Sequence, residues 1–143
     1  MPIIGFNFDR IQVERTEGKI EGKLEVKNDL GIKKVEFEKS PIAGMGEIIK
    51  FSYEFSLKYE PNAGNIQING SLLYTDEEKK LKDIVKAWKK DNKLNQELLQ
   101  MLLNNVLYRC HIKSLVLAQE VNLPAHMNLP YLQKMTQDKN YIG

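Results

Sequence analysis

The sequence predicts an α+β fold in which a roughly four-stranded antiparallel sheet is followed by two helices packed on one face of the sheet. Two observations give this order. Apolar residues recur with a period of two through the first half of the chain, which is typical of strands with one buried face, and the period changes to 3.6 near residue 75. With 143 residues, the chain is expected to form a single domain over 1–143.

The first two predicted strands are irregular. In the first, apolar residues occupy even positions up to Phe8 and odd positions from Ile11 onward, so the strand changes phase near Asp9 and is expected to contain a bulge or bend there. The second apolar run covers residues 20–37, but polar residues and a glycine interrupt it at 28–31. We therefore expect this strand to be broken in the middle.

The third and fourth strands are the clearest prediction. Apolar and polar residues alternate strictly from Phe51 to Tyr59 and again from Ile66 to Tyr74, on either side of the turn-forming sequence PNAG at 61–64. This order indicates a long antiparallel hairpin with one buried face. Its aromatic side chains form either the core beneath the helices or the floor of a groove for extended hydrophobic peptide.

Two helices are predicted after the hairpin. The first begins at Thr75, which has capping-box spacing with Glu78, carries an apolar stripe over 81–88, and ends at 91–92. The second runs from about 95 to about 121, and apolar residues surround most of it. Because one small sheet covers one side of such a helix, the remaining surface is expected to meet another subunit in a homo-oligomer.

The sequence contains no motif that indicates catalysis. Cys110 and His111 are adjacent, but neighbouring residues of a helix point about 100° apart, so they do not face each other as a nucleophile and a base. One cysteine and two histidines, without CxxC or HxxxH spacing, disfavour a metal site. Glycine-rich phosphate loops and GxSxG or HExxH motifs do not occur either. We expect a protein that is not an enzyme and needs no cofactor or metal.

Composition and charge favour a cytoplasmic protein. The sequence shows neither a signal-peptide pattern nor an apolar segment of membrane-spanning length, so membrane insertion is not expected. A formal net charge of +2 does not indicate nucleic-acid binding.

The first helix nevertheless collects lysines opposite its apolar stripe, in a lysine ridge that fits an acidic partner or, in the simpler interpretation, a solvated face. The lysine ridge consists of Lys79, Lys82, Lys86, Lys89, Lys90 and Lys93. Since arginine and aromatic residues do not interleave it, specific nucleic-acid recognition is not expected.

The segment after the second helix, EVNLPAHMNLPYLQKM at 120–135, stays apolar through two prolines. Pro124 and Pro130 lack a backbone donor and bias the residue before them toward extended geometry, so the segment cannot continue the helix. Its apolar side chains form either a lid on the same chain or the wall of a groove that another molecule fills.

The order of strand, strand, long hairpin, helix, long apolar helix and then VNLPAHMNLPYL resembles the SecB family of protein-export and antifolding chaperones. The sequence NLPAHMNLPYL is similar to the connecting loop of that family, L/F-P-x-L-x-L-x-P-V-N-F, at Leu123, Pro124, Leu129 and Pro130, and Tyr131 lies near its aromatic position. The opening FNFDRIQVE is similar to the first strand of the family. The resemblance covers most of the chain.

The resemblance implies a dimer or dimer of dimers that keeps client polypeptides unfolded along hydrophobic grooves, without covalent chemistry, in protein export or a related task. The residues expected to bind clients are Leu123, Pro124, Met127, Leu129, Pro130 and Tyr131. The chain departs from the family in its short link RTEGKIEG. It also carries a lysine ridge, whereas SecB proteins are characteristically acidic where they meet the export motor, so the resemblance does not imply docking to that motor here. The alternative is an oligomeric interaction adaptor without client-holding activity, whose apolar surfaces are permanently filled.

Overall fold

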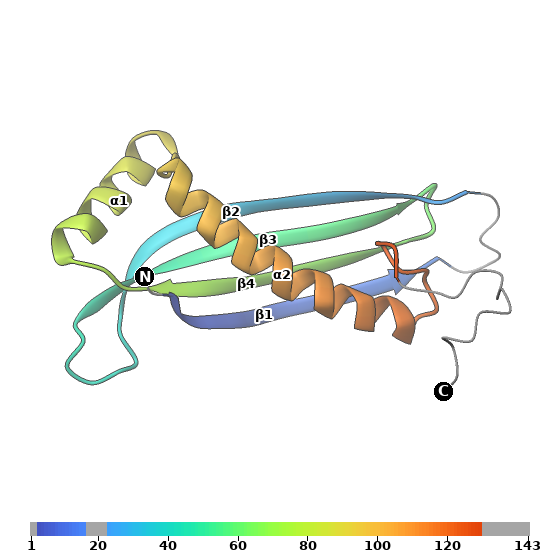
Figure 1. Ribbon diagram of the computed structural model, residues 1–143, viewed down its shortest axis with the longest axis horizontal. Helices are drawn as coiled ribbons and strands as arrows, with labels where there is room; N and C mark the ends of the chain where they lie inside the picture. Colours follow the sequence, from blue (N-terminus) through green and yellow to red (C-terminus); the bar gives the residue numbers. More distant parts are fainter. Residues whose placement is uncertain (1–2, 17–22, 130–143) are drawn as a thin grey trace, which may run out of the picture.

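The computed structural model describes residues 3–16 and 23–129. The elements are strands β1 (Ile3–Arg15), β2 (Glu25–Lys39), β3 (Glu47–Glu60) and β4 (Gly64–Tyr74), then helices α1 (Glu78–Asp91) and α2 (Gln96–Glu120). The strands form one antiparallel sheet in the order β1-β4-β3-β2. α2 crosses one face of the sheet diagonally and α1 lies near one end of it (Figure 1). The predicted α+β layout is confirmed.

The phase change predicted in the first strand is a bulge in β1. Phe8 pairs with Gly70 and Arg10 pairs with Asn69, which leaves Asp9 as an extra residue. One extra residue shifts the alternation of side chains by one position. The apolar side chains before and after the bulge therefore point toward the same face of the sheet, the one that the helices cover.

The second strand is continuous, contrary to the predicted interruption at 28–31. β2 pairs with β3 throughout this range, and its register shift lies between Ile32 and Lys34, where Lys33 is the extra residue. Asp29 and Gly31 pair with polar residues of β3 and share the face without helices. A polar residue on a solvated face does not interrupt a strand, because its side chain stays in water.

The hairpin of β3 and β4 provides most of the core. Side chains at alternate positions of both strands point under the helices and are at most 1% exposed: Ile49, Phe51, Tyr53, Phe55, Leu57, Tyr59, Ile66, Ile68 and Leu72. The opposite face carries mainly serine, asparagine, glutamine and charged residues, with Ile48 and Leu73 as apolar exceptions near one end. The aromatic face is therefore core, and the alternative prediction of a groove floor on this face is wrong because its side chains are covered.

The start of α1 differs from the predicted capping box. The helix begins at Glu78, and the preceding Glu77 makes no side-chain cap, so Thr75 is not the capping residue. Instead Asp76 accepts hydrogen bonds from the Tyr74 hydroxyl and from the Glu77 amide, both at 2.8 Å. The hydrogen bond from Tyr74 is the main reason that the pKa of Asp76 is lowered. The entry to α1 is thus tied to the last residue of β4.

Asparagines end α1 and begin α2. Asn92 adopts the left-handed conformation with φ of 55°, and its amide donates to the Trp88 carbonyl at 2.8 Å, a common way to end a helix. The Asn95 side chain then accepts from the amides of Glu97 and Leu98 at the start of α2. Both the predicted end of the first helix and the predicted extent of the second are confirmed to within about a residue, as far as helix bounds are defined.

Gly70 makes room for a tyrosine that joins three strands. Tyr53 of β3 lies opposite Gly70 of β4, stacks on Phe6 of β1 with ring centroids 5.4 Å apart, and donates to the Asn7 carbonyl at 3.1 Å. A Cβ atom on Gly70 would collide with the Asn7 oxygen and with the Tyr53 ring. The glycine that interrupts the apolar pattern of β4 is therefore required for β3 to reach across to β1.

Replacing Gly70 with Ala is expected to lower the free energy of unfolding by about 1–3 kcal/mol, because the added methyl group must displace either backbone or a buried ring. Urea unfolding followed by circular dichroism measures the change. Gly31→Ala is the matched control, since a Cβ there would meet only the Lys33 side chain at 3.7 Å. Equal stability of the two variants would contradict the role assigned to Gly70.

Candidate functional site

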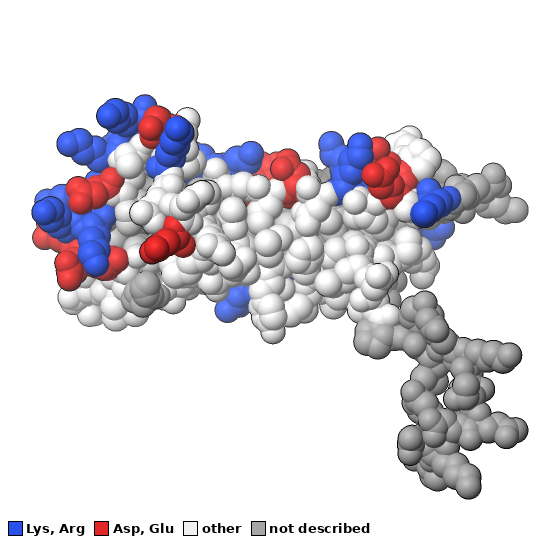
Figure 2. Space-filling view, turned by 45° about the horizontal axis from the view of Figure 1, so that its top comes forward, with Lys and Arg blue, Asp and Glu red and all other residues white. Residues whose placement is uncertain are grey.

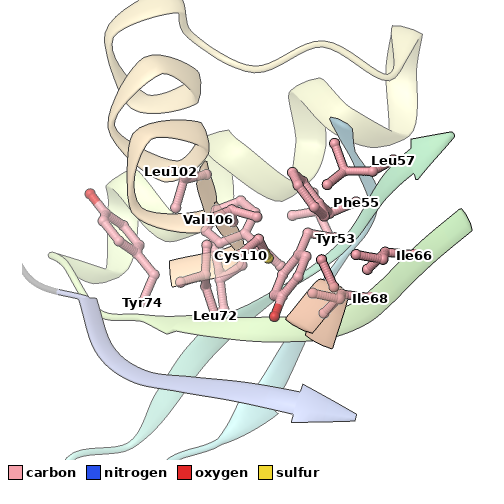
Figure 3. Packing of buried hydrophobic residues seen from close by; sticks show 14 of the residues in the cluster. Tyr53, Phe55, Leu57, Ile66, Ile68, Leu72, Tyr74, Leu102, Val106 and Cys110 are labelled. Atoms are coloured by element: carbon pink, nitrogen blue, oxygen red, sulfur yellow. The ribbon is translucent and has the colours of Figure 1, made fainter. Parts of the chain in front are cut away.

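One row of α2 faces the sheet. Its members are four residues apart and at most 1% exposed: Leu102, Val106, Cys110, Ser114 and Ala118. Leu102, Val106 and Cys110 point into the cluster formed by Tyr53 and Leu72 (Figure 3). Side chains four apart lie on one side of a helix, so this row fixes which side of α2 is buried and which side points outward.

Cys110 is a packing residue. Burial raises the pKa of its thiol to about 12, and the Tyr53 hydroxyl is its hydrogen-bonding neighbour. His111 points toward different partners, with its ring edge-on to Phe55 at 5.5 Å between centroids. A thiol that stays protonated and is covered by the core is a poor nucleophile, so the interpretation of Cys110 as a structural residue agrees with its environment.

The opposite row of α2 is apolar and open to solvent. Tyr108 is 72% exposed, Ile112 51% and Val116 48%. We call these three residues the α2 outer stripe. They are the part of the all-round apolar helix that the sheet cannot cover, and contiguous exposed apolar residues of this kind mark interaction surfaces.

An open groove of about 580 Å³ borders the α2 outer stripe on the β1 side. It is lined by Phe8, the stripe residues and the side chains of Asn105, Arg109 and Lys113. The Arg109 guanidinium lies 4.7 Å from the ring centre of Phe6, and the Lys113 ammonium 5.4 Å from that of Phe8. These cation–π contacts hold both long side chains along the groove.

The segment after α2 turns back onto the sheet at 122–124. The Leu123 amide donates to the Ala118 carbonyl at 2.8 Å, and the Tyr59 hydroxyl donates to the Pro124 carbonyl at 2.7 Å. Leu123 is 5% exposed and packs so tightly on the hairpin that a Cβ on Gly64 would be 3.1 Å from it. Leu123 therefore acts as a core anchor, whereas Pro124 is exposed.

Further along the same segment, the apolar side chains turn outward. Met127 is 47% exposed and Leu129 is 49% exposed. The sequence left open whether this segment is a lid or a groove wall, and the structure contains both features, a lid at Leu123 and exposed apolar side chains beyond it. Two further residues of the predicted client site, Pro130 and Tyr131, lie outside the described residues.

The two histidines of the chain meet where the segment after α2 lies against that helix. His111 Nδ1 and His126 Nε2 are 2.6 Å apart, and the two ring planes are nearly parallel, with centroids 4.8 Å apart and an interplanar angle of 11°. Burial lowers the pKa of both rings, and for His126 the neighbouring His111 adds to the effect. Sequence reasoning missed this pair, because the contact depends on how the chain turns after α2. The described residues contain no cluster of three or more potential metal ligands.

Five residues of the lysine ridge lie on α1, whereas Lys93 lies beyond its end at Asp91, in the connection to α2. All six lysines are exposed. Acidic and basic side chains alternate at this end of the molecule (Figure 2). Lys82 forms an ion pair with Glu78 at 3.1 Å, one turn away. The carboxylates dilute the positive charge of the ridge, so the predicted contact with an acidic partner remains a prediction.

A further exposed apolar group, which the sequence did not single out, lies where β2 leads into β3. Ile42 is 50% exposed and Met45 is 39% exposed in the connecting loop, and Phe37 at the end of β2 is 38% exposed. Within the described part of the chain, no helix is long and apolar enough to span a membrane.

Comparison with known proteins gives a distant structural likeness. No protein-family model matches the sequence, and no curated protein matches it either. The chain is similar to a solved structure of the Mycobacterium tuberculosis Rv1957 SecB-like chaperone in complex with a ChAD peptide from the Rv1956 HigA1 antitoxin. The two have a TM-score of 0.48 and 13% sequence identity, over 94% of this chain and 92% of that chain.

Replacing Ser114 with Ala is expected to raise the free energy of unfolding by about 1 kcal/mol. The Ser114 side chain is fully buried, and its hydroxyl has no hydrogen-bond partner among the described residues. Removing a buried hydroxyl without a hydrogen-bond partner relieves the cost of its desolvation, and alanine also has a higher helix propensity than serine. Cys110→Ala, on the same row, should lower stability instead, since its sulfur fills space against Tyr53. Urea unfolding of both variants checks the opposite signs, and a destabilised Ser114→Ala would contradict this account.

Proposed function

We propose that this protein is a SecB-like chaperone that binds unfolded or extended polypeptides by reversible hydrophobic contact and self-associates through α2. The observation that carries the proposal is the pair of exposed apolar surfaces on α2 and after it, namely the α2 outer stripe and the side chains of Met127 and Leu129. Soluble proteins keep such surfaces when they bind another polypeptide.

The C-terminal segment supports client binding because its backbone is held in place. The anchor at Leu123 and the hydrogen bond from Tyr59 to Pro124 position Met127 and Leu129 before any client arrives. A preorganised wall loses little conformational entropy on binding, so more of the hydrophobic free energy appears as affinity. We extend the proposed client surface to Pro130 and Tyr131 on the basis of the family resemblance.

The α2 outer stripe supports self-association into a dimer or a dimer of dimers. Tyr108, Ile112 and Val116 form a straight row that a second copy of the helix can pack against. The edge strand β2 is an unattractive alternative, because it carries charged residues such as Lys27 and Asp29 along its solvated face, and charges discourage pairing between sheets. Self-association would leave the C-terminal segment available for clients.

The order of elements and the loop sequence NLPAHMNLPYL support placing this activity within a SecB-like framework. We propose a reversible binding function in the cytoplasm, without a cofactor, metal or covalent step. The raised pKa of Cys110 supports this view, because the chain's single thiol is not available as a nucleophile at neutral pH. Protein export is the setting that the family resemblance favours, and the lysine ridge is the surface on which an acidic partner would dock.

A second candidate is an oligomeric interaction adaptor without client-holding activity. The observation that favours it is Leu123, whose side chain belongs to the core and not to an open groove. In an adaptor, Met127 and Leu129 would be filled permanently by one fixed partner or another subunit. Such a protein would present no free apolar surface to a denatured polypeptide.

A test of client binding is suppression of aggregation. The purified protein, at near-stoichiometric amounts, should keep a chemically denatured, unrelated protein in solution, as followed by light scattering. Met127→Ser combined with Leu129→Ser should weaken client binding by roughly 1.5–3 kcal/mol for each side chain that a client buries fully, because that hydrophobic contribution is lost. Unfolding of the variant should be nearly unchanged.

The matched control is Ile42→Ser combined with Met45→Ser, which removes apolar side chains of similar exposure from the loop between β2 and β3. This control should retain client binding. If the Met127 and Leu129 variant loses stability and its folded fraction binds clients as before, the segment is a lid and the adaptor is the better description. Failure of the unmodified protein to suppress any aggregation would reject the chaperone itself.

Self-association is tested by light scattering coupled to size exclusion. At micromolar concentration the protein is expected to have a mass above the 16.5 kDa of one chain. Ile112→Asn should shift the mass toward the monomer, because it puts an amide in the centre of the outer stripe. The control Asn104→Gln lies on the same side of α2, about one turn before Tyr108, and should leave the mass unchanged. A stable monomer of the unmodified chain would show that the stripe is not a self-association surface.

A further inference from the structure

We propose that His111 and His126 form a proton-controlled latch, which holds the C-terminal segment against α2 while the pair keeps a shared hydrogen bond and releases it when both rings are charged. The chain has only these two histidines, and they are in contact although 15 residues separate them. Histidine is the side chain that ordinarily changes charge between about pH 5 and 8. Any side-chain titration in that range is thus concentrated at one contact.

The latch follows from the proton positions that the contact allows. At 2.6 Å, one of the two facing nitrogens must carry a proton and the other must offer a lone pair. A pair with no net charge, or with one extra proton on the outer nitrogen of His111, satisfies this condition. A second extra proton can bind only the remaining lone pair, on His126 Nε2. It leaves N–H opposed to N–H and places two positive rings 4.8 Å apart. The doubly charged pair therefore cannot keep the contact.

The remaining nitrogen of the pair strengthens this conclusion. His126 Nδ1 is buried and has no hydrogen-bond partner among the described residues. When both rings are charged, the facing N–H of His126 is opposed by that of His111, and the His126 N–H at Nδ1 has no acceptor among the described residues in the closed segment. Swinging the segment outward lets water bind this nitrogen, so protonation of His126 favours the open position.

The surroundings offer nothing to compensate the charge. From the sheet, Phe55 presents the edge of its ring to His111, and Tyr59 uses its hydroxyl on the Pro124 carbonyl. From α2, Cys110 stays a neutral thiol that faces Tyr53. The influences on the two histidines are burial and, for His126, the other ring, with no described carboxylate or ammonium group contributing.

The latch controls the part of the segment that carries the exposed apolar side chains. Beyond Pro124, the hydrogen bond that ties the described segment to the rest of the chain is the one between the histidines. Met127 is the next residue after His126, and Leu129 follows two residues later. Their position on the surface therefore depends on whether His126 is held against His111.

The direction of the pH response follows from the lowered pKa of both rings in the closed state. In an open segment His126 loses both the burial and the neighbouring ring that lower its pKa, so its pKa rises back toward the ordinary histidine value. The open state thus binds more protons, so the closed state is fully favoured above about pH 6.5 and loses its advantage as the pH falls below that value. The role of the latch in client binding rests on the proposed function, whereas the opening itself does not.

A nitroxide attached to the cysteine of Met127→Cys tests the opening by electron paramagnetic resonance, since the buried Cys110 thiol does not react. The mobile fraction should rise at least threefold between about pH 7.5 and about pH 5.5, while circular dichroism shows that the fold persists. In the combined variant with His126→Phe, which keeps an aromatic ring and takes up no proton, the mobile fraction should be the same at both pH values. His111→Phe is the second variant, in case His126→Phe does not fold.

Equal label mobility of the parent at both pH values would overturn the latch, and so would a pH response that survives in both phenylalanine variants. The affinity of a labelled unfolded client, measured at the same two pH values, separates this proposal from the proposed function. Opening without any change in client affinity supports the latch and rejects the segment as client surface. Client binding without opening rejects the latch and leaves the chaperone proposal in place.

Discussion

One helix is too narrow to cover this sheet. A four-stranded sheet is about 15–19 Å wide, whereas a helix with its side chains is about 10–12 Å across. α2 crosses the apolar face diagonally, α1 covers part of it near one end, and the segment around Leu123 packs against it near the β3–β4 turn (Figure 1). The groove beside Phe8 and the half-exposed side chains around it are what these three pieces leave uncovered.

The same mismatch explains why α2 has two apolar sides. The inner row, from Leu102 to Ala118, is required for the chain to fold. The outer stripe contributes nothing to that core, because it faces solvent. A sequence selected only for the stability of one chain would carry polar residues at Tyr108, Ile112 and Val116, so their apolar character is best understood through contacts with another polypeptide.

The sequence predicted correctly those parts of the structure in which apolar and polar residues repeat with a regular period. Strict alternation over 51–59 predicted β3, and the change of phase at Asp9 predicted the bulge, since a shift in alternation needs an extra residue. The bulge at Lys33 was missed, because polar residues around it masked the same change of phase. The hydrogen bonds that Asp76 accepts at the entry to α1 were missed as well, since Thr75 offered the spacing of a capping box.

The candidate site was reached only in part, for a physical reason. A segment with two prolines has no periodicity, so nothing in the sequence distinguishes the buried Leu123 from the exposed Leu129. The contact between His111 and His126 depends on the path of the backbone after α2 and not on spacing. The hydrophobic character of the segment was readable from composition, but the direction of each side chain needed the fold.

The position of β1 at the edge, paired with β4 alone, has a consequence for the newly made chain. β1 precedes its partner strand β4 (Gly64–Tyr74) in the sequence, and the Tyr53 hydroxyl that holds Asn7 comes 46 residues after Asn7, so β1 is synthesised before both. Until then Phe6 and Phe8 belong to an extended, apolar segment with nothing to pair with. During its own synthesis the chain therefore passes through an extended, apolar state of the kind that it is proposed to bind in other polypeptides.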